Sequence, residues 1–573
     1  MSSAPVVADT PSGQPGRRDL WIDLLWLAVL AVWCTSWCVT SAARTGATYD
    51  EPFYLEAGIS NWRHGKTEGT STNGVMFLPV NVATLPLHIH EKQSGETVST
   101  PELITHLPRA RLMTLGWLAI LVLSAMRLGQ TFGGPWAGRL AAGLIAADPT
   151  FLAHSSIATT DISVSATLLA LTLYAYLGQT GGWLQRVLLP GFCFGIAVMC
   201  KLSALLYGGV ILVAIEVIHW VASGELLRPA GASIGEWLRR VAGRITRSVL
   251  VVAAIIGIGI GIAILVTGFP DRGTRPMADV LKAIPKTDPQ RERYQRYADE
   301  YDQVPYAVVA FAFQMWHNST GRPAFLNGTY YPEGCWYHFP VLLSMKIPVP
   351  VMLLALGVLL RIRRAFNPVM SIALVLLMVT LTAKLQTGIR LVLPVVALGY
   401  VAVAVGVVRG YGRCGAYAGC VAVALIAATS VWVWPHGLGY LNQLAGGPSA
   451  APERVADSNL DWGQGIPDLL EWHKANGEPR IMLWYFGTDP AAWKSPFMPI
   501  GPERATITSG GDLRRLVGPN YLAVSTSVLS LHPDISPSKR AAVDYLRTVT
   551  PAARTPTFVI YDFRVSVKPA HQE

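Results

Sequence analysis

The feature that most constrains this chain is its series of long apolar runs, because a backbone can cross a lipid bilayer only as a helix or as part of a closed barrel. A spanning helix needs about 20 predominantly apolar residues. We find eleven candidate spans, near residues 20–42, 110–128, 136–153, 161–178, 185–200, 202–222, 248–268, 347–361, 368–384, 390–408 and 414–435. The chain is 51% hydrophobic and 14% charged, whereas globular chains contain about 25% charged residues. The sequence therefore predicts a mainly α, polytopic membrane protein with about eleven transmembrane helices.

The distribution of basic residues predicts how the spans are oriented. If the N-terminus is inside, the short outer loops hold three basic residues, Lys201, Lys384 and Arg390. The inner segments then hold fifteen, namely Arg17, Arg18, Arg127, Arg139, Arg186, Arg228, Arg239, Arg240, Arg244, Arg247, Arg361, Arg363, Arg364, Arg409 and Arg413. Basic loops stay on the cytoplasmic side, so we expect a cytoplasmic N-terminus and, with an odd number of spans, an extracytoplasmic C-terminus. The same distribution accounts for the net charge of +10 without nucleic acid as a partner.

Three parts follow from this topology. Residues 1–19 are rich in Pro, Gly and Ser and predict a disordered cytoplasmic tail. Residues 20–436 form the transmembrane domain, with large outer loops at 44–109 and 269–346, and residues 437–573 contain no span. Strand-like stretches at 480–488, 520–529 and 557–563 and helix-like stretches at 465–477 and 538–549 predict a small extracytoplasmic α/β domain in this last part. Since both loops and this domain lie on one side, they could build one active face.

Two adjacent acids, Asp50 and Glu51, follow the first span in "TYDEPFYLEAG" (48–58). Pro52 suits the first turn of a helix, and either acid suits its N-cap. The apolar face of this helix would carry Tyr54, Leu55, Gly58, Ile59 and Trp62. The simpler interpretation is that Asp50 only caps the helix. The alternative is that its carboxylate, placed at the membrane edge, takes part in a reaction.

A third acid, Asp161, begins the fourth span in "DPTFLAHSSIATTD" (148–161), seven residues after His154. An ionisable residue at this depth indicates function, although Asp161 or Thr160 could also serve as an N-cap. The predicted topology puts this turn on the same side as Asp50. That agreement favours a shared site over two separate caps.

Isolated cations recur at the outer ends of three hairpins, as Lys201, Lys346 and Arg390. Each could merely extend its charged end to the membrane interface. Two or three of them converging near headgroup depth would instead suit a phosphate carried by a lipid. Acids beside such a cationic cradle favour a reaction at a phosphoester.

The segment "DSNLDWGQG" (457–465) gathers polar groups around one aromatic ring. Asp457, Asn459, Asp461 and Trp462 could contact a sugar or an acceptor, or could form a capped turn before the next helix. The signatures GxSxG, P-loop, HExxH and paired CxxC are absent. A metal site at the two histidines of "PLHIH" has weak support, because two loop histidines are mostly structural.

The stretches described so far resemble a known family. The resemblance is carried by "YDEPFYLEAGISNWRHG", "LAHSSIATTD", "YHFPVLLSMKIPVP", "DSNLDWGQG" and "YFGTDPAAW". They are similar to stretches of the bacterial branch of the protein O-mannosyltransferase family, which includes the aminoarabinose transferases of lipid A. These membrane glycosyltransferases use polyprenyl-phosphate sugars. The resemblance implies the C-type glycosyltransferase (GT-C) fold and a multi-pass location in the plasma membrane, which is the inner membrane in bacteria.

The resemblance also implies roles for individual residues. Asp50 resembles the catalytic carboxylate, and Asp161 is similar to the second active-site acid, with His154 near it. Lys201, Lys346 and Arg390 resemble the contacts to the lipid phosphate. His338 and the four polar residues of 457–465 are then candidates for substrate binding.

In the implied reaction, an acceptor hydroxyl attacks the anomeric carbon of the lipid-linked sugar and inverts its configuration. Asp50 would act as the general base, and Glu51 would tune Asp50 by like-charge repulsion or position the substrate. Asp161 would orient the acceptor or the sugar. The expected partners are the lipid-linked donor, membrane lipids and a protein, lipid or glycan acceptor. Such a site needs no metal in principle, and a divalent cation stays open.

Two other classes of function compete with a transferase. A transporter or flippase of lipid-linked substrates would also place charges in the membrane, often on inverted repeats, of which the sequence shows none. A membrane-anchored binding protein would act through residues 437–573. The surface position of the acids favours the transferase.

Overall fold

The computed structural model describes residues 17–224, 227–229, 231–301, 303–501, 506–530 and 537–564. The protein is mainly helical and carries a small sheet domain near its C-terminus, as the sequence predicts. The predicted N-terminal tail lies outside the described residues up to residue 16, and the first helix begins at Arg17.

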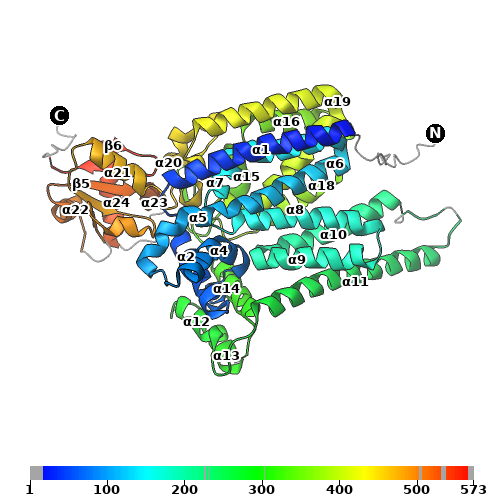
Figure 1. Cartoon of the computed structure of the whole chain (residues 1–573), viewed down its shortest axis with the longest axis horizontal. Helices are drawn as coiled ribbons and strands as arrows, with labels where there is room; N and C mark the ends of the chain where they lie inside the picture. The colour runs from blue at the N-terminus through cyan, green and yellow to red at the C-terminus, as the bar shows by residue number, and fades with distance from the viewer. Residues whose placement is uncertain are drawn as a thin grey trace.

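Ten helices of the described residues form an elongated bundle, with the sheet domain at one end of the molecule (Figure 1). They are α1 (Arg17–Arg44), α6 (Thr114–Ala147), α8 (Asp161–Leu177), α9 (Leu189–Cys200), α10 (Ser203–Ser223), α11 (Ile234–Thr267), α15 (His338–Lys346), α16 (Val349–Leu360), α18 (Pro368–Thr380) and α19 (Leu393–Trp432). Short elements between them are α7 (Pro149–Ser155), η2 (Gly178–Thr180), η3 (Leu184–Leu188), α17 (Ile362–Ala365) and η4 (Ile389–Leu391). The long helices, such as α1, α6, α11 and α19, run along the long axis, whereas α15 is bent by 112° against α16. We call the end of the bundle that carries the sheet domain the head.

The bundle contains fewer long apolar helices than the eleven predicted spans. Within the described residues, six helices are long and apolar enough to cross a membrane, or seven if the bent pair of α15 and α16 counts as one span. The shorter apolar helices are Leu184–Cys200 and Pro368–Thr380. The number eleven therefore stays a prediction.

Part of this difference arises because two long helices each cover two predicted spans. The break in α6 lies at Gly134 (φ 79°), and the break in α19 lies at Gly412 (φ 58°). These positive φ angles favour glycine. A Cβ atom on Gly129 would meet the backbone oxygen of Ala137 at 2.7 Å, so α6 folds back on itself at Gly134.

The chain between α1 and α6 packs at the head. It contains α2 (Glu51–His64), α3 (Glu68–Ser71), α4 (Phe77–Ser94), η1 (Thr100–His106) and α5 (Leu107–Leu112). The predicted helix after Asp50 is confirmed as α2, which ends at Gly65 in a left-handed conformation. It buries Tyr54, Leu55 and Ile59, and the last two join a core with α4 and α5.

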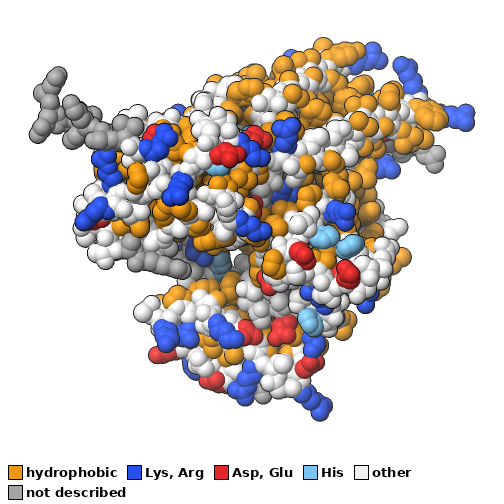
Figure 2. Space-filling model, turned by 60° about the vertical axis from the view of Figure 1, so that its left-hand side comes forward, with side chains coloured by type: hydrophobic (Ala, Val, Ile, Leu, Met, Phe, Trp, Pro, Cys, Tyr) orange, Lys and Arg blue, Asp and Glu red, His pale blue; other side chains and the backbone are white. Residues whose placement is uncertain are grey.

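The chain between α11 and α15 forms a second part of the head, with α12 (Pro276–Ala283), α13 (Arg291–Glu300), α14 (Tyr306–Thr320), β1 (Ala324–Leu326) and β2 (Thr329–Tyr331). In a space-filling view, hydrophobic side chains cover much of the bundle, while charged side chains gather over the sheet domain and the lower part around α12–α14 (Figure 2). This contrast is the one that a membrane-spanning bundle with a water-exposed head requires.

The elements after α19 are η5 (Gly437–Gly439), η6 (Gln443–Ala445), η7 (Pro448–Ala450), α20 (Ala451–Arg454), η8 (Asp457–Asn459), α21 (Ile466–Ala475), β3 (Ile481–Trp484), η9 (Pro490–Trp493), β4 (Phe497–Pro499), α22 (Gly510–Val517), β5 (Tyr521–Ser525), α23 (Thr526–Ser530), α24 (Pro537–Thr548), β6 (Ala553–Arg554) and β7 (Phe558–Asp562). The sheet order is β4-β3-β5-β7-β6. Strands β4, β3 and β5 are parallel, and β7 pairs antiparallel with β5 and β6. The three predicted strands and two predicted helices are present. The short strands β4 and β6 were not predicted.

Candidate functional site

Asp50 lies at the head of the bundle, at the start of α2. Its backbone occupies the N-cap position, but its side chain makes no capping hydrogen bond. Instead, its Oδ2 atom accepts a hydrogen bond of 2.9 Å from Nη1 of Arg390, which lies 340 residues later. The two side chains are 25% and 16% exposed. The capping interpretation of Asp50 is therefore wrong for its side chain, and the carboxylate faces a solvent-accessible site.

Arg390 lies in η4, and the segment 457–465, which we call the hub segment, holds it in place. Its guanidinium stacks on the ring of Trp462 at 4.1 Å. The backbone N–H of Ile389 donates to Oδ1 of Asn459 at 2.9 Å, and Gly388 (φ 127°) leaves no room for a Cβ atom against Ser458. Arg390 is thus held in place, and its Nε–H group still has no acceptor among the described residues.

A second acid–cation pair lies beside the first. Asp161 begins α8, and its Oδ1 atom accepts a hydrogen bond of 2.5 Å from Nζ of Lys201, the residue between α9 and α10. Asp161 is buried, whereas Lys201 is 23% exposed. Arg390 lies within electrostatic range of Asp161 as well as of Asp50. The structure therefore brings Asp50, Asp161, Lys201 and Arg390 together, as the sequence predicts.

His154 lies near Trp462, on the short helix α7. Its ring centroid is 6.5 Å from that of Trp462, and neither of its nitrogens has a hydrogen-bond partner in the described part of the chain. Burial, together with the charges of Arg390 and its neighbours, lowers the pKa of His154 to about 4. The imidazole is therefore neutral near pH 7 and can either donate or accept a hydrogen bond.

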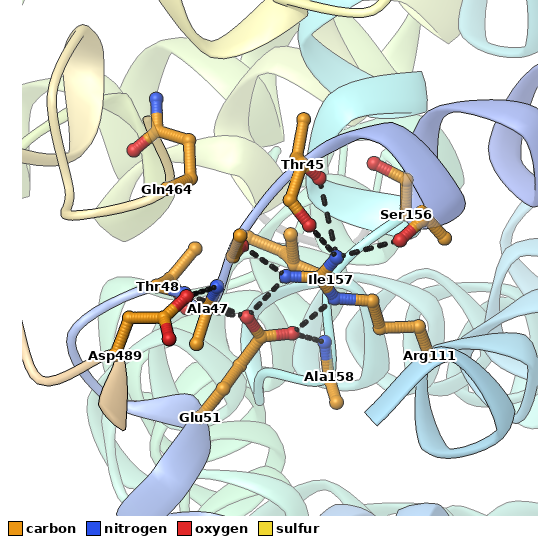
Figure 3. A network of polar contacts seen from close by, with 12 residues as sticks. Thr45, Ala47, Thr48, Glu51, Arg111, Ser156, Ile157, Ala158, Gln464 and Asp489 are labelled. Carbon is orange, nitrogen blue, oxygen red and sulfur yellow. Dashed lines mark hydrogen bonds and ion pairs between the residues drawn. The ribbon is translucent and has the colours of Figure 1, made fainter. Parts of the chain in front are cut away.

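Glu51, adjacent to Asp50 in sequence, occupies a different environment (Figure 3). Its carboxylate is fully buried and accepts hydrogen bonds from the N–H and the hydroxyl of Thr48, from Nε and Nη2 of Arg111, and from the N–H of Ala158. Burial alone would raise the pKa of Glu51, but the charge of Arg111 and these donors more than offset it, and the pKa lies below its usual value. Glu51 joins α2 to α5 and to the turn before α8.

Lys346 and His338, both on α15, are also buried. The ammonium of Lys346 donates to the backbone oxygens of Leu438 at 2.6 Å and of Asn459 at 2.7 Å, and so connects α15 to the hub segment. His338 packs edge-on against Phe339 and makes no side-chain hydrogen bond to any described residue. The phosphate contact of Lys346 and the substrate contact of His338 stay predictions.

The hub segment places its four predicted residues in two directions. Asp457 and Trp462 face Arg390, and burial, partly opposed by Arg390, raises the pKa of Asp457 to about 6. Asn459 and Asp461 instead bind backbone, since Asp461 accepts from the N–H of Ser527 at 2.9 Å. Burial raises the pKa of Asp461 to about 7. No side chain of this segment caps α21, whose N-cap is Gly465.

Two residues of the site were not predicted as functional. Tyr54, assigned to the apolar face of α2, is within electrostatic range of Asp50, Asp161 and Arg390. Burial, followed by the charge of Asp50, keeps the pKa of Tyr54 well above its usual value. Arg111, the partner of Glu51, lies at the start of a predicted span. An arginine at the edge of an apolar run is the only sequence signal that could have indicated a buried partner.

A metal site has no support from the described residues, among which no group of three or more His, Cys, Asp or Glu side chains could hold an ion. His88 stacks on Trp62 at 4.9 Å, and His90 lies against His106. The two histidines of the weak metal hypothesis therefore pack against other rings.

No family model matches the chain, and no curated protein matches it in sequence. Among solved structures, ArnT from Cupriavidus metallidurans in the apo state is similar over 95% of this chain and 98% of its own, with a TM-score of 0.45 and 13% identity. The same protein bound to undecaprenyl phosphate is similar over 96% of this chain and 99% of its own, with a TM-score of 0.45 and 14% identity. An Archaeoglobus fulgidus oligosaccharyltransferase tethered with an acceptor peptide is similar over 93% of this chain and 72% of its own. Its TM-score is 0.42 and its identity is 11%. At this level of similarity, the function has to be argued from the site itself.

Proposed function

We propose that this protein is a membrane glycosyltransferase that moves a sugar from a polyprenyl-phosphate carrier to an acceptor hydroxyl on the extracytoplasmic face, with inversion at the anomeric carbon. The observation that carries the proposal is the partly exposed Asp50–Arg390 pair. It places a carboxylate that can take a proton beside a guanidinium that can bind a phosphate. The residue pattern of the GT-C transferases, described above, supports the same activity.

An apolar groove between two helices of the bundle supports a lipid carrier. A cavity of about 590 Å³ lies between α10 and α18, lined by Leu205, Leu206, Gly209, Val210, Val213, Ala214, Val217, Ile218, Ser371, Val375 and Val379. Near the head, the Tyr207 hydroxyl donates to the backbone oxygen of Leu391 at 3.1 Å and so ties α10 to the loop of Arg390. A polyprenyl chain in this groove would bring its phosphate to Arg390 and Lys201.

Arg390 and Lys201 carry the hydrogen-bond donors that a phosphate group needs. Arg390 carries five N–H groups and Lys201 three. Oxygens of the phosphate would take up the free Nε–H of Arg390 and compete with Asp50 for Nη1. Binding of the donor would thereby loosen the Asp50–Arg390 pair and make the carboxylate available as a base.

The transfer step joins the acceptor to the sugar and releases the lipid phosphate. The acceptor oxygen forms a bond to the anomeric carbon from the face opposite the phosphate, and the bond between that carbon and the phosphate oxygen breaks. The hydroxyl proton passes to Asp50, which as a positioned base contributes roughly 10²–10⁴-fold. Arg390 and Lys201 stabilise the charge that develops on the departing phosphate. Asp161 holds Lys201 in position, and Glu51 fixes the backbone that carries Asp50.

A direct test is Asp50→Asn in membrane vesicles supplied with a polyprenyl-phosphate sugar. We expect sugar transfer to fall by about 10²–10⁴-fold while the amount of folded protein stays unchanged, because the Asp50 side chain caps nothing. Glu56→Gln, on the exposed face of the same helix, serves as the matched control. Full transfer by the Asp50 variant would refute the assignment of the base.

A further inference from the structure

The sheet domain contains a cavity at a topological switch point. Strands β3 and β5 are parallel neighbours, but the chain leaves β3 toward β4 on one side and leaves β5 toward β7 on the other. Open sheets of this kind bind ligands outside the carboxyl ends of the strands at that point. A cavity of about 300 Å³ lies there, and its wall includes Trp484, Tyr485, Phe486, Trp493, Ser527 and Lys539. This volume is at the lower end of the range for small-molecule sites.

Four aromatic residues contribute to the cavity wall, and this limits which ligands fit. Trp493 is 67% exposed at the end of η9, and the rings of Tyr485 and Phe486 are half-buried. Sugar rings present flat faces of C–H groups that pack on aromatic rings, while their hydroxyls use a few polar groups, and Lys539 supplies one at this wall. A peptide would instead need partners for its backbone, which it usually finds by adding a strand to a sheet edge. The cavity wall instead lies mainly at the carboxyl ends of β3 and β5.

The chain segment that forms the cavity wall also contacts the candidate active site. The ring of Phe486 stacks on Tyr49, the residue before Asp50, with centroids 5.5 Å apart. The hydroxyl of Thr488 donates to the backbone oxygen of Tyr49 at 2.7 Å. The chain that forms the cavity wall thus directly supports the residue before the proposed base.

We propose that this cavity binds a saccharide unit of the acceptor, so that the acceptor is a glycan or a glycolipid. The binding of a saccharide stands on the cavity alone, whereas its role as acceptor rests on the proposed transferase function. Trp493 supplies the stacking face. Phe486 and Tyr49 connect the bound sugar to Asp50.

The test uses the full chain in lipid nanodiscs and saturation-transfer NMR with three soluble disaccharides: mannobiose, lactose and chitobiose. We expect the wild type to bind at least one of them, and Trp493→Ala to weaken that binding about 10-fold through loss of the stacking face. Trp493→Phe keeps a ring and should retain most of the affinity. Trp336→Ala is the matched control, because Trp336 is 68% exposed and does not line the cavity.

The outcomes separate this proposal from the transferase itself. Absence of binding by all three disaccharides at millimolar concentration, or unchanged binding by Trp493→Ala, would overturn it. Binding of a Ser/Thr-rich peptide alone, lost in Trp493→Ala, would also overturn it and assign the cavity to a peptide. Asp50→Asn should keep disaccharide binding, so a failure of the proposed base leaves this measurement intact.

Discussion

Asp50 and Glu51 are neighbours in sequence and opposites in structure. Each carboxylate pairs with an arginine, but the Asp50–Arg390 pair is 25% and 16% exposed, whereas the Glu51–Arg111 pair is 0% and 1% exposed. Among the described residues, five donors saturate Glu51, while the Asp50 carboxylate receives one hydrogen bond, from Arg390. The buried pair holds the head together, and the exposed pair can exchange its partner for a substrate.

The difference shows that charge at a membrane edge has two distinct uses. A fully buried ion pair adds little stability compared with apolar residues packed in the same place. Removing one partner, however, leaves a buried charge without compensation, which is strongly destabilising. A partly exposed pair gives little stability in itself, so its partners can change at low cost. Stability measurements and activity measurements should therefore separate the two acids.

The largest expected effect is on stability, from Glu51→Gln. Every contact of the Glu51 carboxylate is a donor (Figure 3), so the amide NH₂ of glutamine would face N–H groups and leave Arg111 without a counter-charge. We expect the free energy of unfolding to fall by about 3–5 kcal/mol, read as a lower Tm in detergent.

Asp279→Asn, which breaks an exposed pair with Lys282, is the control and should leave the Tm nearly unchanged. If Glu51→Gln yields too little folded protein, the double variant Glu51→Leu/Arg111→Met should recover part of the loss, because it removes both charges. A Glu51→Gln protein that is as stable as the wild type but inactive would instead make Glu51 part of the chemistry.

The substitution Arg390→Lys should have a smaller effect, on the binding of the lipid phosphate. Lysine lacks the planar fork that stacks on Trp462 and reaches Asp50 at the same time. We expect the affinity for undecaprenyl phosphate in nanodiscs to fall about 10-fold, which is about 1.4 kcal/mol. Lys384→Ala, an exposed cation before the same element, should leave it unchanged. Equal affinities for the Lys variant and the wild type would argue against the phosphate cradle.

The smallest expected effect concerns the pH dependence of stability, through His154. Burial lowers its pKa to about 4, below the ordinary value of 6.5, so between these values the unfolded state binds more protons. Stability from this group is therefore complete above pH 6.5 and is lost as the pH falls toward 4, by about 1 kcal/mol at pH 5.5.

His154→Leu should remove this component, so that its Tm falls less than that of the wild type between pH 7.5 and pH 5.5. His64→Gln, at an exposed histidine of α2, should follow the wild type. Parallel curves for the His154 variant and the wild type would show that His154 does not titrate in this window.

Much of the candidate site could be predicted from the sequence, because ionisable residues beside apolar runs are rare and costly. That reasoning found Asp50, Asp161, Lys201 and Arg390, all of which the structure brings together. It did not predict that Glu51 is buried against Arg111, because burial depends on what packs against α2 from distant parts of the chain. Tyr54 was assigned to an apolar face, since its hydroxyl becomes relevant only when Asp161 and Arg390 lie next to it.

The sequence by itself determined the apolar segments, the helix after Asp50 and the α/β pattern of the last part, because these depend on local periodicity and turn residues. The tertiary structure decided the partners. Arg111 pairs with Glu51, Arg390 pairs with Asp50, and Lys346 binds backbone oxygens of the hub segment. These choices rest on contacts between residues up to 340 positions apart, and local sequence carries no information about which distant donor will fill the space beside a buried or an exposed carboxylate.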